Sequence, residues 1–227
     1  MHKQETSDTL KPYRLDPQER RKMAKQIPDI VIGRLPVYLR ALLQMSQEGR
    51  QVTSSQELGE RLGISAAQIR KDLSQFGEFG KQGTGYNIEF LANQVKEILN
   101  VNRVWDIAIV GAGDIGRALA GYNGFSERGF RIQMIFDNKP ELIGTQSGPF
   151  TIKDSRTMKE EIQAAGIKMA MIAVPATQAQ AVTDQLVEAG VKAILSYAPV
   201  NLNVPPGVHV QNIDPSIHLQ RMTYYLE

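Results

Sequence analysis

Three glycines after an apolar run have the spacing that most directly indicates chemistry. In "IAIVGAGDIGRALAGY", Gly111, Gly113 and Gly116 form the pattern G-x-G-x-x-G. The first glycine allows a tight turn from strand to helix, the second lets the backbone approach a pyrophosphate, and the third lets the helix pack close to the strand. Backbone N–H groups and the dipole at the start of the helix then bind the phosphates. The pattern predicts a dinucleotide site.

An acidic residue at the end of the next apolar run supports this prediction. In "RIQMIFDNKP", Asp137 follows the glycines at close to the offset of about 20 residues at which a carboxylate binds the ribose. A carboxylate repels a 2′-phosphate, so Asp137 favours NAD(H) over NADP(H). From these two stretches, the residues expected at the cofactor are Gly111, Ala112, Gly113, Asp114, Ile115, Gly116 and Asp137.

A second stretch, "SAAQIRKDLSQFGEFGKQGTGYNI", predicts a helix that binds DNA. Ser65, with Gln68 three residues later, has the spacing of a capping box. Ile69, Leu73 and Phe76 then recur at helical spacing, so they are expected to face the core. The polar residues expected mostly on the opposite face are Gln68, Arg70, Lys71, Asp72, Ser74 and Gln75.

Side chains on that polar face suit base edges and phosphates. The segment after the helix is rich in glycine and carries Lys81, which suits a contact in the minor groove or on the backbone. The residues expected to contact DNA are Ser65, Gln68, Arg70, Lys71, Ser74, Lys81, Gly83 and Gly85.

The neighbouring elements complete a winged helix. "GRLPVYLRALLQMSQEG" predicts a first helix with Pro36 in its first turn, and "SSQELGERLGIS" predicts a second helix that Gly63 ends. With the third helix they follow the helix-turn-helix plan. The alternation in "FGEFGKQGTGYNIEFL" predicts a hairpin, the wing, and "IEFLANQVKEILNV" predicts one more helix. The apolar residues expected inward on the first helix are Leu35, Leu39, Leu42, Leu43 and Met45.

The second half alternates between apolar runs and helical patterns. The runs "VWDIAIV", "RIQMIF", "MAMIAV", "AILSY" and "VHVQNI" are separated by helical patterns around 115–122, 156–165 and 176–189. This alternation predicts a parallel sheet with crossover helices. The end of the chain, "DPSIHLQRMTYYLE", predicts a capped terminal helix.

Together these patterns predict an α/β protein. It has an N-terminal winged-helix domain and a C-terminal Rossmann-like domain with a doubly wound parallel sheet. The expected parts are a flexible N-terminal arm over 1–26, a winged-helix DNA-binding domain over 27–103, a Rossmann NAD(H)-binding domain over 104–213 and a terminal helix over 214–227.

Composition narrows the classes of protein. The 227 residues are 42% hydrophobic and include no cysteine, which excludes disulfides and thiolate metal sites, and no metal site is expected. No apolar run approaches the roughly 18–20 residues of a membrane span, and the polar start lacks the core of a signal peptide, so we expect a cytoplasmic protein. Basic residues outnumber acidic ones over 1–103 and the reverse holds over 104–227, which suits a first half that meets a polyanion.

The residues provide no evident acid or base for hydride transfer. A dehydrogenase needs such a group near the nicotinamide, and the histidines of the chain are His2, His209 and His218. His2 lies in the tail, and His218 is expected to pack on the terminal helix. A dinucleotide site without catalytic groups indicates sensing rather than turnover.

With these motifs the sequence resembles the Rex family of redox-sensing transcriptional repressors over nearly the whole chain beyond residue 26. The matching stretches are "RLPVYLR", "IRKDLSQFGEFGKQGTGY", "VGAGDIGRAL", "YNGF", "IFDNKP", "AVPA", "APVNL" and "NID". The resemblance implies a homodimer that represses transcription. It binds an inverted-repeat operator with NAD⁺ or without ligand, and NADH releases it without turnover. The terminal helix is implied to be domain-swapped onto the partner subunit.

The resemblance also implies roles for individual residues. Arg34, Tyr122 and Asp214 look like the redox-coupling residues: Asp214 pairs with Arg34 in one state and turns to Tyr122, beside the nicotinamide, in the other. An apolar pocket at the nicotinamide favours the neutral ring of NADH over the positive ring of NAD⁺. The further cofactor contacts expected are Val174, Pro175, Ala176, Tyr197 and Tyr122.

Two other functions stay open at this point. The first is an NAD-dependent oxidoreductase with an added protein-binding domain, which steady hydride turnover would reveal. The second is a repressor whose Rossmann domain senses another nucleotide, such as a coenzyme A thioester. Competition binding between nucleotides would separate the second from an NADH sensor.

Overall fold

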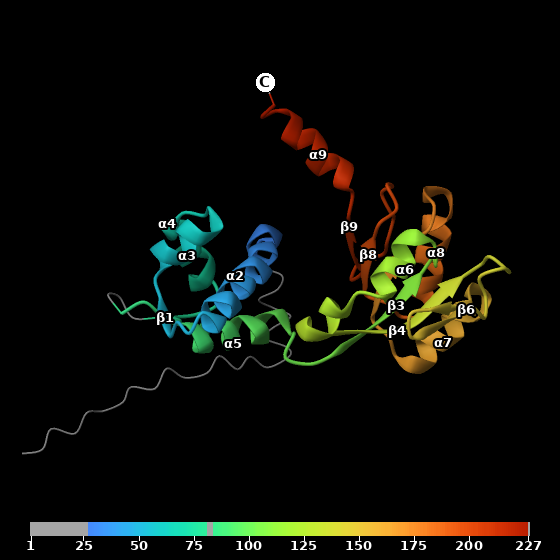
Figure 1. Cartoon of the computed structure of the whole chain (residues 1–227), viewed down its shortest axis with the longest axis horizontal. Coiled ribbons are helices and arrows are strands. Elements are labelled where there is room, and N and C mark those ends of the chain that lie inside the picture. Colours follow the sequence, from blue (N-terminus) through green and yellow to red (C-terminus); the bar gives the residue numbers. More distant parts are fainter. Residues whose placement is uncertain (1–26, 81–83, 227) are drawn as a thin grey trace, which may run out of the picture. The chain divides into compact units, whose positions relative to one another are not determined.

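The chain forms two compact units, which divide between Asn102 and Arg103. The computed structural model describes residues 27–80 and 84–226, so the predicted flexible arm lies outside the described residues. Figure 1 shows the first unit in blue to green and the second in green to red. No helix in the described ranges combines the length and the apolar character needed to cross a bilayer.

Four helices make most of the first unit. They are α2 (Asp29–Gln47), α3 (Ser55–Leu62), α4 (Ala66–Ser74) and α5 (Ile88–Leu99). The side chains of Ser54, Ser65 and Asn87 cap the last three, each accepting a hydrogen bond from a backbone N–H three residues later. Gly63 ends α3 in the left-handed conformation, at φ 67°. Helix α3, this turn and α4 confirm the predicted helix-turn-helix.

Helix α2 begins earlier than the sequence predicted. Pro36 therefore lies inside the helix and not in its first turn. Leu43, predicted to face inward, is 38% exposed. Because adjacent residues are about 100° apart around a helix, Leu42 and Leu43 do not share the centre of one face. The buried face consists of Val31, Leu35, Tyr38, Ala41, Leu42 and Met45.

A Cβ on Gly80 would lie 2.6 Å from the carbonyl oxygen of Gly85, so the two flanks of the hairpin predicted within residues 76–91 come close together. Since its middle lies outside the residues that the structure describes, the hairpin stays a prediction. In this stretch the described residues form one strand, β2 (Tyr86–Asn87), which pairs antiparallel with β1 (Val52–Thr53) from before α3. Gly85 lies against β1, since a Cβ there would come 2.5 Å from the carbonyl oxygen of Thr53. The phenylalanines of this segment pack into the helical core.

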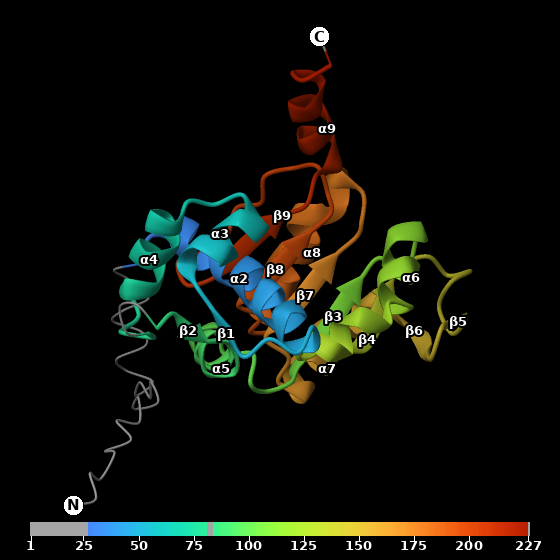
Figure 2. The ribbon, with the colours of Figure 1, turned by 60° about the vertical axis from the view of Figure 1, so that its left-hand side comes forward.

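The second unit is built on a seven-stranded sheet. Its strands are β3 (Trp105–Val110), β4 (Phe130–Asp137), β5 (Gln146–Ser147), β6 (Phe150–Asp154), β7 (Met169–Ile172), β8 (Ala193–Ser196) and β9 (His209–Asn212). Their order is β5-β6-β4-β3-β7-β8-β9, and all neighbours except β5 and β6 are parallel. Without β5, this is the strand order of dinucleotide-binding folds. Figure 2 shows the strands fanned out from β9 to β5.

Helices cover both faces of this sheet, which confirms the doubly wound Rossmann-like fold. They are α6 (Asp114–Ala120), η1 (Asn123–Arg128), η2 (Ser155–Thr157), α7 (Met158–Ala165) and α8 (Ala176–Glu188). Successive side chains of a strand point to opposite faces. Ala108 and Val110 of β3 pack with α7 and α8, whereas Ile107 and Ile109 pack in the core on the side of α6.

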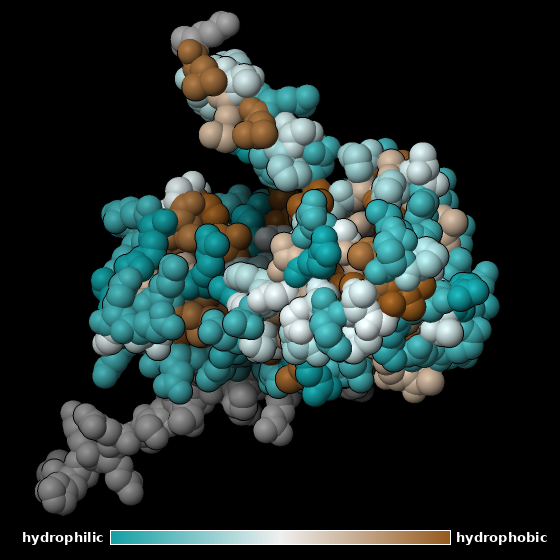
Figure 3. Space-filling model, turned by 45° about the vertical axis from the view of Figure 1, so that its right-hand side comes forward, coloured by the Kyte–Doolittle hydropathy of each residue, from teal (hydrophilic) through white to brown (hydrophobic). Residues whose placement is uncertain are grey.

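Two features at the edges complete the second unit. Strands β5 and β6, which the sequence analysis missed, form an antiparallel hairpin and make the sheet mixed at this edge. The last helix, α9 (Pro215–Thr223), was predicted, and none of its residues is buried. Figure 3 shows apolar side chains gathered on it. Its most exposed large apolar residues are Ile217, Leu219 and Met222, followed along the chain by Tyr224, Tyr225 and Leu226.

We predict that Leu35→Ala lowers the free energy of unfolding of the first unit by about 2–5 kcal/mol, because Leu35 is fully buried and the change leaves a cavity. Leu43→Ala is the matched control, since Leu43 keeps contact with water, and its effect should stay below about 1 kcal/mol. Urea unfolding followed by circular dichroism measures both. Equal losses in the two variants would contradict the assigned buried face.

Candidate functional site

A cavity of about 480 Å³ opens at the carboxyl ends of the central strands of the second unit. The strand order reverses at β3, which lies between β4 and β7. In open α/β sheets ligands bind at this switch point, and the volume suits a small ligand or cofactor. The predicted cofactor residues that line the cavity are Gly111, Gly113, Asp114, Ile115, Asp137, Val174, Pro175 and Tyr197. Those that do not are Ala112, Gly116, Ala176 and Tyr122.

The three glycines of the fingerprint meet different amounts of space. A Cβ at Gly116 would lie 1.8 Å from the carbonyl oxygen of Gly111, and a Cβ at Gly111 would lie 2.4 Å from that of Ala173. Gly111 also has φ +101°, which L side chains rarely adopt. A Cβ at Gly113 would meet nothing within 4 Å. Gly111 and Gly116 therefore serve the packing, whereas the space beside Gly113 is open to a ligand.

Asp137 is tied to the glycine turn. Its Oδ2 accepts a hydrogen bond of 2.6 Å from the backbone N–H of Ala112, and its Oδ1 accepts one of 2.9 Å from that of Lys139. Ala112 thus fixes the carboxylate and does not line the cavity. Each carboxylate oxygen accepts about two hydrogen bonds, so both retain capacity for a ribose hydroxyl.

Four polar residues of the cavity were not among the predicted cofactor contacts: Asn138, Lys139, Ser155 and Gln178. Asn138 donates a hydrogen bond to Gln178 over 3.4 Å. Ser155 directly follows β6, a strand that the apolar pattern did not reveal. Because parallel strands end at the same edge, the residue directly after each strand is the signal that would have found Asn138 and Ser155, whereas Gln178 lies in α8.

Part of the cavity wall is apolar. Val174, Pro175 and Tyr197 contribute to it. Burial raises the pKa of the Tyr197 phenol, so this side chain is uncharged at neutral pH. The wall therefore favours an uncharged ring over a charged one.

Tyr122, which the resemblance places beside the nicotinamide, directly precedes η1 and is 52% exposed. Its ring contacts Phe125 edge to face, with ring centres 4.9 Å apart. A Cβ on Gly124 would lie 2.4 Å from its hydroxyl oxygen, so glycine at 124 leaves room for the ring.

The exposed face of α4 carries three of the eight predicted DNA contacts. Arg70, Lys71 and Ser74 are exposed. Arg70 donates a hydrogen bond of 2.9 Å to the hydroxyl of Ser55 at the start of α3, and Ser74 donates one of 2.9 Å to the carbonyl of Lys71. Both cations are available to phosphates and base edges.

The other predicted DNA contacts are placed differently. Ser65 is the N-cap of α4, and its hydroxyl accepts a hydrogen bond of 3.2 Å from the N–H of Gln68. The side chain of Gln68 does not return to Ser65, so only half of the predicted capping box forms. Lys81 and Gly83 lie outside the described residues.

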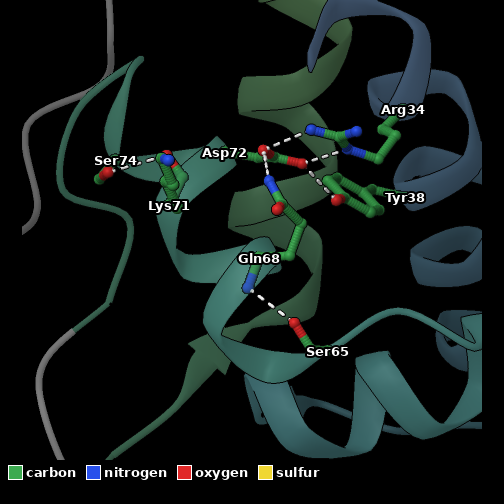
Figure 4. Close-up of polar contacts among 7 residues, drawn as sticks. All are labelled: Arg34, Tyr38, Ser65, Gln68, Lys71, Asp72 and Ser74. Carbon is green, nitrogen blue, oxygen red and sulfur yellow. Dashed lines mark hydrogen bonds and ion pairs between the residues drawn. The ribbon is translucent and has the colours of Figure 1, made fainter. Parts of the chain in front are cut away.

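The prediction for Asp72 was wrong. It was expected on the outward face of α4, and the structure shows it fully buried. Figure 4 shows three side chains converging on its carboxylate. Arg34 donates through Nε over 2.5 Å and through Nη2 over 2.8 Å, and the hydroxyl of Tyr38 donates over 2.6 Å. The amide of Gln68 donates over 2.6 Å. Helices α2 and α4 are thus joined by a buried ionic network.

Electrostatics keep this carboxylate ionised. Burial by itself raises the pKa of Asp72, but hydrogen bonds from Arg34, Tyr38 and Gln68 outweigh it, so the pKa lies below its usual value. Burial and the bond to Asp72 raise the pKa of Tyr38 well above the usual value, which keeps its proton on the donor. The network therefore stays charged and complete at neutral pH.

Asp214 caps the terminal helix α9. Its Oδ1 accepts hydrogen bonds from the backbone N–H of Ser216 over 2.9 Å and from the hydroxyl of Ser216 over 2.6 Å. These bonds lower the pKa of Asp214. Asp214 and Arg34 belong to different units, so their predicted pairing stays a prediction.

Fold and site define a class of protein: a helix-turn-helix unit joined to a Rossmann-like unit with a nucleotide-sized cavity. Two family models agree with this division. Residues 26–74 match "Putative DNA-binding protein N-terminus", and residues 102–200 match "CoA binding domain".

Full-length relatives identify the family. The redox-sensing transcriptional repressor Rex of Roseiflexus sp. (strain RS-1) is 54% identical over 199 residues, which cover 88% of this chain and 90% of that protein. The redox-sensing transcriptional repressor Rex 1 of Thermotoga maritima is 45% identical over 203 residues, 89% of this chain and 97% of that protein. This chain belongs to the Rex family of redox-sensing transcriptional repressors.

Solved structures agree with this assignment. The crystal structure of RSP in complex with beta-NAD⁺ and operator DNA matches with a TM-score of 0.84 and 38% identity, over 88% of this chain and 92% of that one. RSP in complex with beta-NADH matches with a TM-score of 0.81 and 36% identity, over 88% and 94%. RSP is itself described as a Rex-family repressor.

The glycines yield a paired prediction. Gly111→Ala should destabilise the second unit by about 3 kcal/mol or more, because its Cβ meets backbone and its φ is positive. Gly113→Val should leave the melting temperature within about 3 °C of the parent, yet abolish NADH binding because the side chain fills the open space. Thermal unfolding and NADH fluorescence titration measure these effects. A Gly113→Val protein that still binds NADH would refute the assignment of the space beside Gly113 as part of the cofactor site.

Proposed function

We propose that this chain is a transcriptional repressor whose binding to DNA depends on the NADH/NAD⁺ ratio. It binds an inverted-repeat operator as a homodimer, with NAD⁺ or without ligand, and NADH binding releases it. The observation that carries the proposal is the open space beside Gly113 at a dinucleotide crevice, in a chain whose other unit presents a basic helix face.

The residues of the cavity fit NAD(H). The open glycine turn and the start of α6 would hold the pyrophosphate, and Asp137 would bind the adenosine ribose. Val174, Pro175 and Tyr197 would face the nicotinamide end. Since NADH has a neutral ring and NAD⁺ a positive one, this apolar wall favours the reduced cofactor.

We propose that the protein does not turn its cofactor over. The acidic groups that line the described cavity are Asp114 and Asp137. Asp137 accepts backbone hydrogen bonds through both oxygens, and Asp114 lies in the first turn of α6, the end that binds phosphate. Neither carboxylate is placed to exchange a proton at a nicotinamide, and the raised pKa of the Tyr197 phenol keeps the proton on that side chain.

Coupling would run through Arg34, Tyr122 and Asp214. In the proposed scheme the carboxylate of Asp214 pairs with Arg34 when the protein holds DNA and turns to Tyr122 when NADH is bound. The partial exposure of Arg34 and Asp214 and the exposure of Tyr122 support this, because each can meet a partner outside its own unit.

Helix α9 would make the dimer. None of its residues is buried within this chain, while it presents Ile217, Leu219 and Met222, each more than 60% exposed. A contiguous exposed apolar surface indicates an interface. We propose that α9 packs, domain-swapped, on a second copy of the chain. As an operator-binding repressor, the protein would act in the cytoplasm.

Arg70→Ala and Lys71→Ala should each weaken operator binding about five- to tenfold and reduce its salt slope by about one, because each removes one cation from the DNA face. NADH affinity should not change. Lys192→Ala, an exposed lysine of the second unit, is the matched control. Fluorescence anisotropy on a duplex enriched by the parent protein from a random pool provides the readout. Parental operator affinity in both variants would refute the assigned DNA face.

Asp214→Asn should abolish release by NADH while NADH still binds. Asparagine caps a helix as well as aspartate does, so α9 stays intact while the charge disappears. The measurement is operator anisotropy during an NADH titration at fixed NAD⁺, with coenzyme A thioesters as competitors. Release equal to that of the parent would exclude the switch role, and release by a thioester alone would favour the rival nucleotide.

A further inference from the structure

The two edges of the Arg34 guanidinium face different surroundings. Its Nε and Nη2 both donate to the buried carboxylate of Asp72. The side chain is 22% exposed, and Nη1 has no hydrogen-bond partner among the described residues. Arg34 therefore has one edge inside the unit and one edge available to a second acidic group.

The inner edge is hard to release. Asp72 has no exposed side-chain surface, and its four hydrogen bonds use both oxygens. If Arg34 left, a buried carboxylate would lose its charge partner, which is strongly unfavourable. A planar pair with two bonds also fixes direction as well as distance. Whatever displaces Arg34 therefore moves Asp72, and with it α4, rather than breaking the pair.

We propose that Asp72 is a positioning residue: it transmits a displacement of Arg34 to α4, the helix that binds the operator. Arg34 bridges two acids: it keeps Asp72 on its inner edge and takes the second carboxylate on its outer edge. When the Arg34 guanidinium moves, α4 therefore moves with it. This inference rests on the proposed function and deepens it, because it identifies how the DNA-binding unit receives the signal.

Asp72→Asn tests the proposal, with Tyr38→Phe as the matched control. Asparagine keeps the shape but loses the charge, whereas phenylalanine removes one hydrogen bond from Asp72 and leaves both bonds from Arg34. For each protein, the readout is the ratio of operator dissociation constants at saturating NADH and at saturating NAD⁺. NADH affinity and the melting temperature are measured alongside.

We expect Asp72→Asn to reduce this ratio about tenfold or more relative to the parent, within the range of allosteric couplings, while NADH affinity stays within about twofold. Tyr38→Phe should keep the parental ratio within about threefold. A purely structural role would lower operator affinity equally with both cofactors and leave the ratio unchanged. An unchanged ratio in folded Asp72→Asn would therefore overturn the proposal.

A second variant covers the case in which Asp72→Asn does not fold. The double change Arg34→Met and Asp72→Leu replaces a buried ion pair by apolar side chains, which proteins often tolerate without loss of stability. The double variant should bind NADH, but its ratio of operator dissociation constants with NADH and with NAD⁺ should be near one. A ratio equal to that of the parent would overturn the inference. A parent protein that NADH does not release would instead refute the proposed function, and transmission through Asp72 with it.

Discussion

The first unit is organised around a carboxylate that has no contact with water. Asp72 is stable in that place only because charged and polar donors surround it. Arg34 and Tyr38 come from α2 and Gln68 comes from α4 itself, so the network joins two helices that lie far apart in the sequence. Apolar contacts tolerate small shifts, whereas short hydrogen bonds hold their partners at fixed distances. The ionic network therefore restricts the placement of α4 on α2 more narrowly than the core beneath it.

In the second unit the decisive constraint is steric, whereas in the first unit it is electrostatic. The turn at Gly111 and the close packing at Gly116 leave no room for a side chain, and they bring the start of α6 to the end of β3. Beside Gly113, by contrast, a Cβ would meet nothing within 4 Å, so the space there is open. Asp137 accepts a hydrogen bond from inside this turn, so the residue expected to bind ribose also fixes the loop expected to bind phosphate.

How well the sequence predicted each feature depended on how local its cause is. The glycine turn and the N-cap of α4 at Ser65 follow from backbone conformation within a few residues, and both were predicted. Asp72 was misplaced because a charged residue in a helix is usually solvated, and its charge partner Arg34 lies 38 residues away. The β1–β2 pairing also joins distant segments, and β6 is short and half polar, so neither has a periodic signal. In each case the structure depends on a partner that is distant in the sequence, which a local pattern does not reveal.

A rigid ionic link suits a sensor whose ligands differ so little. In the proposed function NADH and NAD⁺ differ by one charge on one ring, so most of their contacts are shared and do not shift the equilibrium. Moving a population from 1:99 to 99:1 takes about 5.5 kcal/mol, roughly half from each site of a dimer, which is within the usual range of coupling energies. A flexible connection would lose part of this energy in its own rearrangement. A buried pair that is unfavourable to break moves as one piece, so the small difference between the cofactors reaches α4.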